Sequence, residues 1–209
     1  GLTTKYTKRG EAMYRRIGEK IEAIAENVRG GMAVFFPSYA LLKAILAYLS
    51  PQIRRRVMVE RREMGKTERN RLYEQLRDEE SGILFAVQGG SFSEGMDYES
   101  NTLKAIIVVG LPLSPPTLEV KATQGYYTGK YGADKGRLYG YLYPAITKVL
   151  QAAGRGIRSE HDRCIIVLMD YRFAQFPYKR CLPPDFDMIF TDRVEDLCRS
   201  FFNSGSETN

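Results

Sequence analysis

The sequence contains few of the residues that build metal sites, disulfide frameworks or membrane spans. Its 209 residues include one histidine, His161, and three cysteines with no C-x-x-C pair. Cys164, Cys181 and Cys198 are odd in number and widely spaced, which is typical of reduced intracellular thiols. There is no secretory signal, and no apolar run approaches the ~18 residues that a membrane-spanning helix needs. We therefore expect no metal site, disulfide or membrane contact, and a cytoplasmic protein (nuclear if eukaryotic).

Two nucleotide-binding signals are present only in part. Gly65-Lys-Thr67 matches the end of a phosphate-binding P-loop, but the first glycine of that motif is replaced by Glu60. Asp78-Glu-Glu80 resembles the acidic Mg²⁺ motif of helicases, yet it follows a polar helical pattern instead of a buried strand. We interpret the first as the charged start of a helix and the second as its solvated end. Neither segment is expected to hold ATP or Mg²⁺.

The apolar pattern predicts an α/β fold built as one domain. With 44% hydrophobic residues, the chain can bury one substantial core. An amphipathic helix is expected from Met13 to Gly30, and a helix capped by Ser38 is expected to run to about Leu49. Continuous apolar strands are expected at 32–36, 57–59, 82–87, 104–109 and 164–169. Buried strands separated by helices indicate a doubly wound, mainly parallel sheet with helices on both faces, which binds ligands at its carboxyl edge.

The most informative segment is Gln151-Ala-Ala-Gly-Arg-Gly-Ile-Arg158. On a continuous helix, Gln151, Arg155 and Arg158 stand at i, i+4 and i+7 and share one face. Two guanidinium groups directed at one place indicate an anion between them, and arginine binds phosphate in a bidentate manner. Gly154 and Gly156 would allow a nucleotide or a facing domain to approach closely. The alternative is a helix end with an exposed basic cap.

Other segments fit contacts with phosphates or nucleic acid. Gln88 to Asp97 is a glycine-rich segment at a strand's carboxyl end, suited to sugar or phosphate, or simply an ordinary turn. Ser38 either holds a phosphate at a helix N-terminus or only caps the helix. The net charge of +6 favours a polyanionic partner. Between residues 112 and 154, tyrosines interleaved with basic residues suit base stacking, although helix packing explains some of them. The densest basic patch begins at Arg54 and can equally be a solvated face.

Taken in order, these segments resemble the second RecA-like domain of the XPD/Rad3 group of superfamily 2 DNA helicases, including archaeal XPD proteins. Phe35-Phe-Pro-Ser-Tyr39 resembles motif IV, and Gly90-Ser-Phe-Ser-Glu-Gly-Met-Asp97 resembles motif V, usually G-x-F-x-E-G-I-D. The segment from Gln151 to Ser159, then Asp162-Arg163 and Leu168-Met-Asp-Tyr-Arg-Phe173, resembles motif VI and its following strand. The resemblance runs from about residue 10 to 200. Met96 and Cys164 depart from the common residues, Ile and Gly.

The resemblance implies a C-terminal helicase domain spanning 1–209, with a small helical insertion at about 115–150, in a fragment of a larger protein. Its partners would be single-stranded DNA and the first RecA-like domain of the same protein. That domain would carry the P-loop, the Mg²⁺ motif and an iron–sulfur cluster, so ATP and Mg²⁺ would bind between the two. The activity implied is ATP-dependent 5′ to 3′ DNA unwinding, in repair, with the isolated chain inactive.

The resemblance also assigns residues. Arg155 and Arg158 would reach the β- and γ-phosphates, one of them as an arginine finger, and Gln151 would position the attacking water or γ-phosphate. The expected ATP-binding residues are Glu94, Gly95, Asp97 and Gly154. The expected DNA-binding residues are Ser38, Tyr39, Arg54, Ser91, Tyr126 and Tyr127. The alternatives are a DinG-type iron–sulfur helicase domain and a non-enzymatic nucleic-acid-binding or partner-docking module. The repair pathway and partner proteins stay open.

Overall fold

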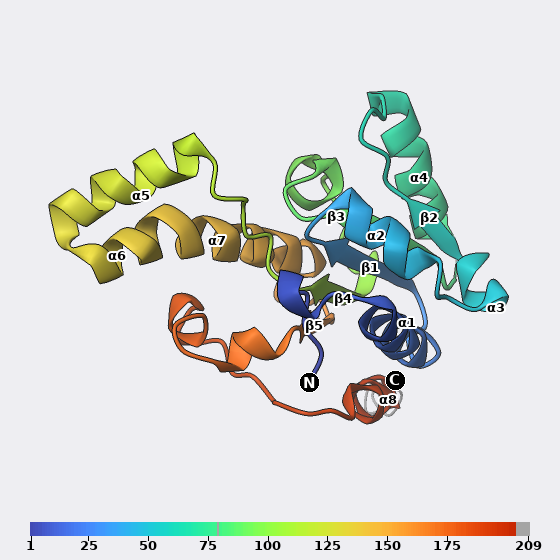
Figure 1. The fold of residues 1–209 in the computed structure, drawn as a ribbon. Coiled ribbons are helices and arrows are strands. Elements are labelled where there is room, and N and C mark those ends of the chain that lie inside the picture. The colour runs from blue at the N-terminus through green and yellow to red at the C-terminus, as the bar shows by residue number, and fades with distance from the viewer. Residues whose placement is uncertain (79, 204–209) are drawn as a thin grey trace.

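The computed structural model describes residues 1–78 and 80–203, and it has a five-stranded parallel sheet (Figure 1). The strands are β1 (Gly31–Phe36), β2 (Val57–Val59), β3 (Ile83–Val87), β4 (Leu103–Val109) and β5 (Ile165–Met169). Their order across the sheet is β2-β3-β1-β4-β5, and every neighbouring pair is parallel. The predicted strands and the doubly wound α/β class are confirmed.

One face of the sheet is covered by α1 (Glu11–Ala25), α2 (Tyr39–Leu46), α3 (Pro51–Arg54) and α8 (Val194–Asn203). Because side chains alternate along a strand, Val34 and Phe36 of β1 face these helices. Ile21 of α1 and Ile45 of α2 are fully buried against them. The two helices end earlier than predicted, at Ala25 and Leu46, and Ser38 caps α2 by accepting a hydrogen bond from the Leu41 N–H.

The opposite face is covered by α4 (Lys66–Asp78) and α7 (Tyr143–Ala153). Phe35 of β1 and Ile106 of β4 point to this side and pack with Leu76 and Val149. Helix α4 begins within the G-K-T segment, so that segment is a helix start as predicted. Asp78 ends α4 with a mostly exposed carboxylate, while Glu79 lies outside the described residues. Helices therefore cover both faces of the sheet.

The connection from β4 to β5 is mainly helical. It contains α5 (Leu118–Tyr131), α6 (Ala133–Arg137), the π-helical turn η3 (Leu138–Leu142) and α7. Thr117 caps α5 by accepting a hydrogen bond from the Val120 N–H. No residue of α5 is buried, and α5 and α6 project away from the sheet beyond α7 (Figure 1). This arrangement leaves the tyrosines of α5 open to a partner.

The remaining short turns are η1 (Tyr6–Lys8), η2 (Ser91–Gly95), η4 (Gly154–Gly156), η5 (Tyr171–Ala174) and η6 (Lys179–Cys181). The N-terminal segment is fastened to the end of β5. The Asp170 carboxylate accepts hydrogen bonds from the Thr3 hydroxyl and the Thr4 N–H and pairs with Arg172 at 2.8 Å. All four residues are buried. Sequence reasoning did not find this contact, because nothing local links residues 3 and 170.

Candidate functional site

The candidate site begins at the carboxyl edge of the sheet, where β1, β3 and β4 end side by side, and extends to the segment between α7 and β5. Gln88, directly after β3, ties these ends together from a buried position. Its Nε2 group lies 3.3 Å from the Phe35 carbonyl oxygen, 3.1 Å from that of Val109 and 3.3 Å from that of Gly110. Sequence reasoning placed Gln88 in the loop without assigning it this role. The edge is therefore a fixed platform for the loop that follows.

That loop, residues 88–97, is held by Arg155. The Arg155 guanidinium donates to three backbone carbonyl oxygens, those of Ser93 at 2.6 Å, Glu94 at 2.9 Å and Met96 at 3.0 Å. The loop residues Ser91–Gly95 form the π-helical turn η2, with Phe92 and Ser93 buried. Arg155 thus joins the two segments that the sequence singled out, although its guanidinium was expected to face outward to a phosphate.

The prediction of one continuous helical face is wrong. Helix α7 ends at Ala153, residues 154–156 form the 3₁₀ turn η4, and Ile157 is extended with φ −129° and ψ 107°. Glycine is a poor helix former, and Gly156 is packed so tightly that a Cβ there would lie 2.3 Å from Cys164 Sγ. Arg158 therefore reaches the site from an extended segment, and Gln151 stands exposed on the last turn of α7.

The two arginines nevertheless converge. Arg158 Nη2 lies 3.4 Å from the Met96 carbonyl oxygen, which Arg155 also contacts, and 2.8 Å from the Asp97 carboxylate. Of these side chains, that of Arg158 is 37% exposed and that of Asp97 is 92% exposed. The Arg158 guanidinium makes both of these contacts through Nη2. The solvent-facing end of this pair can therefore accept an anion in place of Asp97.

Asp162 fixes the backbone on which Arg158 stands. Its carboxylate accepts hydrogen bonds from the N–H groups of Arg158 at 2.7 Å, Ser159 at 2.8 Å and Asn101 at 2.8 Å, and from the Ser100 hydroxyl at 2.5 Å. The Ser100 hydroxyl is the main reason that the pKa of Asp162 lies well below its usual value, and the backbone donors lower it further. The sequence placed Asp162 beside the arginine segment but gave it no role.

The glycines expected at a nucleotide contact have open space around them. A Cβ added at Gly95 or Gly154 would meet no atom of this domain within 4 Å. Packing within this domain therefore does not require glycine at either position. The Glu94 side chain is exposed, and only its backbone carbonyl is engaged by Arg155.

The residues expected to bind DNA lie in three places. Ser38 and Tyr39 follow β1 at the start of α2, where Ser38 serves as a helix cap. Arg54 lies at the other end of α2, just before β2, and donates to the Leu46 carbonyl oxygen at 2.8 Å. The Tyr39 ring is half-buried beneath the Arg62 guanidinium, and burial raises its pKa. Ser91 begins the loop turn after β3, next to β1 in the sheet.

Tyr126 and Tyr127 belong to an aromatic cluster on α5 and η3. Their ring centroids are 5.3 Å apart, and Tyr127 continues the cluster to Tyr131 and Tyr139 at 6.3 and 5.7 Å. The Lys130 ammonium lies 5.9 Å from the Tyr126 ring centroid and 5.3 Å from that of Tyr131. Exposed rings with a cation beside them offer a stacking surface for bases.

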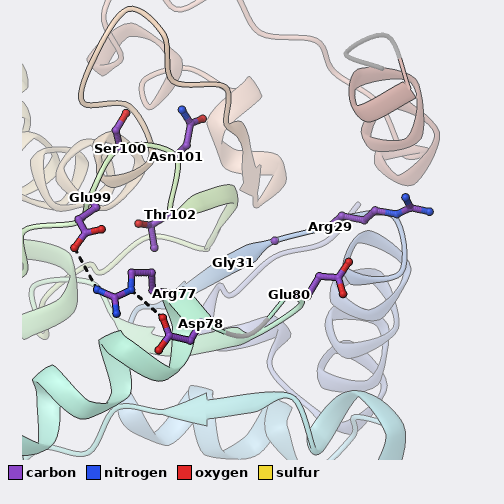
Figure 2. A pocket seen from close by; sticks show the side chains of 10 residues that line it. Arg29, Gly31, Arg77, Asp78, Glu80, Glu99, Ser100, Asn101 and Thr102 are labelled. Carbon is purple, nitrogen blue, oxygen red and sulfur yellow. Dashed lines mark hydrogen bonds and ion pairs between the residues drawn. The ribbon is translucent and has the colours of Figure 1, made fainter. Parts of the chain in front are cut away.

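A separate pocket of about 510 Å³ lies at the opposite, amino edge of the sheet (Figure 2). It is lined by Gly31 and Thr102 at the starts of β1 and β4 and by the end of α4. The Arg77 guanidinium lies between the carboxylates of Asp78 and Glu99 and donates a hydrogen bond to each, so its positive charge is paired within the domain. None of the predicted site residues lines this pocket, but its lining residues Ser100 and Asn101 donate to Asp162, which fixes the backbone of Arg158.

Within the described ranges, no group of three or more histidine, cysteine and acidic residues could hold a metal ion. The three cysteines are free thiols, and burial raises the pKa of Cys164 to about 12 and that of Cys198 to about 11. No helix in the described part of the chain is long and apolar enough to cross a membrane.

Known proteins resemble this chain along most of its length. Residues 21–187 match the family model of the helicase C-terminal domain. The chain is 25% identical over 185 residues to the ATP-dependent DNA helicase XPD of Sulfolobus acidocaldarius, covering 87% of this chain and 32% of that protein. It is 33% identical over 202 residues to the regulator of telomere elongation helicase 1 of Mus musculus, covering 87% of this chain and 17% of that protein. The chain thus spans about a third or less of these relatives.

Solved structures agree with the fold. An XPD helicase structure matches with a TM-score of 0.71 and 24% identity, over 86% of this chain and 32% of that one. The C-terminal domain of the DEAD-box protein Dbp5 matches with a TM-score of 0.55 and 13% identity, over 91% and 92% of the two chains. The predicted RecA-like fold and the predicted family are both confirmed, and the chain belongs to the helicase C-terminal domain family.

Proposed function

We propose that this domain is the second motor half of an ATP-dependent DNA helicase of XPD/Rad3 type, which moves 5′ to 3′ on single-stranded DNA in repair. The whole protein would act inside the cell, in the nucleus if it is eukaryotic. The observation that carries the proposal is the convergence of Arg155 and Arg158 on the Met96 carbonyl oxygen, between the segments that lead into β4 and β5. The family of the chain supports this reading, as does an arginine pair in a sequence without a P-loop.

In this proposal ATP binds between this domain and a first RecA-like domain of the same protein. The first domain would supply the P-loop and hold Mg²⁺ and an iron–sulfur cluster. Bound ATP supplies the phosphoryl group that is transferred to water. Arg158 would be the residue that reaches the γ-phosphate, because its side chain is partly exposed and its partner Asp97 is almost fully solvated. An ion pair screened by water is weak, whereas bidentate pairing with a phosphate between two domains is stronger.

Arg155 would act mainly by holding the loop, since three carbonyl oxygens already engage its guanidinium. Gln151, exposed one turn earlier on α7, would orient the attacking water. Glu94, Gly95, Asp97 and Gly154 would complete the nucleotide side of the site. Because Arg155 connects α7 to the loop after β3, a nucleotide that moves Arg158 would also move that loop. This connection would couple ATP hydrolysis to DNA contacts.

Single-stranded DNA would contact the carboxyl edge of the sheet and the α5 cluster. Ser38, Tyr39 and Ser91 follow the ends of β1 and β3, where they would meet the sugar–phosphate backbone. Arg54 lies just before β2, at the other end of α2, and would meet the backbone separately. Tyr126 and Tyr127, with Lys130 beside them, would stack bases. Base stacking on aromatic side chains contributes about 1–3 kcal/mol per base. The excess of six positive charges would add salt-dependent attraction for the polyanion.

The test is DNA-stimulated ATP hydrolysis after the missing half is supplied, in trans or by fusion to this chain. We expect activity with the native chain and a loss of about 10³-fold or more with Arg158→Ala, the scale of an arginine finger in other phosphoryl-transfer enzymes. Arg155→Ala should also abolish most activity by releasing the loop. The isolated chain should hydrolyse no ATP. Activity that is indifferent to both substitutions would leave a nucleic-acid-binding module instead of a motor.

A further inference from the structure

Glu60 places a buried carboxylate beneath the loop that Arg155 holds. It directly follows β2, is 3% exposed, and its own N–H donates to the Phe85 carbonyl oxygen at 2.8 Å, continuing the pairing with β3. Its carboxylate accepts a hydrogen bond from the Val87 N–H at 2.9 Å. Burial raises the pKa of Glu60, and the N–H groups of Val87, Phe92 and Ser91 oppose that rise by donating to the charged form.

The Glu60 carboxyl group and the Arg155 guanidinium bind opposite ends of the loop backbone. Glu60 accepts hydrogen bonds at the start of the loop, whereas Arg155 donates to the carbonyl oxygens of Ser93, Glu94 and Met96 at its end. A π-helical turn of five residues cannot satisfy its own terminal N–H and C=O groups. Acceptor oxygens on the N–H side and a guanidinium donor on the C=O side therefore fix the turn between them.

The Glu60 carboxylate lies very close to the loop backbone at Gly90. A Cβ at position 90 would lie 2.8 Å from each Glu60 carboxylate oxygen and 2.7 Å from Val87 Cγ2. Because the contact is tight, a shift of the carboxylate would change the path of the loop at its first turn. That path leads within seven residues to Asp97, the partner of Arg158.

We propose that Glu60 is a positioning residue of the motor site. It fixes the backbone at the start of the loop from Gly90 to Asp97, while Arg155 fixes the backbone at its end. This inference rests on the proposed function, because it assigns Glu60 a part in ATP hydrolysis coupled to DNA. Glu60 touches neither nucleotide nor DNA in this arrangement. Its effect on the reaction passes through the loop to Arg155 and Arg158.

The test uses the full-length helicase that contains this domain, with Glu60→Gln as the isosteric change. We expect the DNA-stimulated kcat for ATP hydrolysis to fall between about tenfold and a hundredfold, the effect of misplacing catalytic groups by around an ångström. The KM for ATP should change less than about threefold, because the first domain would supply most ATP binding. Hydrogen exchange at the amides of residues 87–96 should become about tenfold faster.

Three further variants separate positioning from general loss of stability. Glu63→Gln makes the same chemical change on an exposed side chain of the same segment and should leave kcat and exchange as in the native protein. Ile21→Val removes a buried methyl group on the other face of the sheet and should lower the melting temperature without a tenfold loss of kcat. Gly90→Ala displaces the carboxylate without removing it and should reproduce the faster exchange.

The outcomes distinguish this inference from the proposed function. Native exchange rates across residues 87–96 in Glu60→Gln, or a kcat within twofold of the native value, would overturn the role of Glu60. A native full-length protein without DNA-stimulated ATP hydrolysis would overturn the motor function. In that case faster exchange in Glu60→Gln would still establish that Glu60 sets the loop, and unchanged exchange would reject both.

Discussion

The Nε group of Arg155 donates a hydrogen bond of 2.6 Å to the backbone carbonyl oxygen of Ser93, which lies 62 residues earlier in the chain. This bond joins the segment after α7 to the loop after β3. The guanidinium is therefore a structural part of this domain, in contrast to that of Arg158, which is directed towards solvent and Asp97. Arg155 therefore holds the loop in place, whereas Arg158 is available to a ligand.

The two arginines should differ in their effect on stability. Arg155→Ala leaves the carbonyl oxygens of Ser93 and Glu94 without a charged donor and that of Met96 with Arg158 alone, and it should lower the free energy of unfolding by about 1–3 kcal/mol. Arg158→Ala removes a largely solvated ion pair and should lower it by less than about 1 kcal/mol. Urea denaturation of chain 1–209, followed by circular dichroism, measures both. Arg16→Ala, on the exposed face of α1, is the control. Equal effects of the two changes would contradict the division of roles.

Asp162 should stabilise the domain only above acidic pH. Its hydrogen bonds depress the pKa of the carboxyl in the folded state, so its contribution is complete above the unfolded pKa of about 4 and is lost as pH falls through the lower folded pKa. The native chain should therefore melt at a higher temperature than Asp162→Asn at neutral pH, and the difference should shrink below about pH 4. Melting curves at several pH values measure it. A difference that grows on acidification would be inconsistent with a depressed pKa.

Tyr126 should contribute to DNA affinity through stacking. Its side chain is among the most exposed aromatic groups, at 63%, so Tyr126→Ala should leave folding intact. We expect binding of single-stranded DNA to weaken by about 1–3 kcal/mol, with the slope of affinity against salt unchanged. Fluorescence anisotropy with a labelled oligonucleotide measures both quantities. Tyr6→Ala removes a still more exposed tyrosine, at 83%, from the N-terminal segment and should bind DNA as the native chain does.

The buried pair of Asp170 and Arg172 should be the most sensitive electrostatic contact in the domain. Their side chains are 0% and 8% exposed, so Asp170→Asn leaves a buried guanidinium without its counter-charge. We expect a loss of about 3–5 kcal/mol in the free energy of unfolding, together with release of the segment around Thr4. Urea denaturation gives the first and limited proteolysis the second. Glu11→Gln, at the exposed pair with Arg15, should change stability by less than about 0.5 kcal/mol. Tight retention of the N-terminal segment would count against the prediction.

The sequence alone determined the fold class, the strands and the segments that meet at the site. Strands such as 83–87 are continuous apolar runs, because both faces of the sheet are buried. Such a run can be recognised from the sequence of the strand itself. The placement of the start of the glycine-rich loop at the carboxyl edge followed from parallel topology. The arginine segment instead precedes β5 and is joined through Asp162 to Ser100 and Asn101, which precede β4. The resemblance in three separated motifs identified the family.

Only the tertiary structure decided what each charged side chain contacts. The break of α7 at Gly154, the turn of Arg155 onto three carbonyl oxygens and the buried carboxylate of Glu60 depend on backbone groups that are distant in sequence. Sequence reasoning counted Glu60 only as the residue that breaks a P-loop. A hydrogen bond to a carbonyl or an amide carries no residue-type signal, because every residue has those groups. The apolar pattern of a helix or strand can be recognised from consecutive residues. The hydrogen-bond partners of polar groups depend on how distant segments pack in the folded domain.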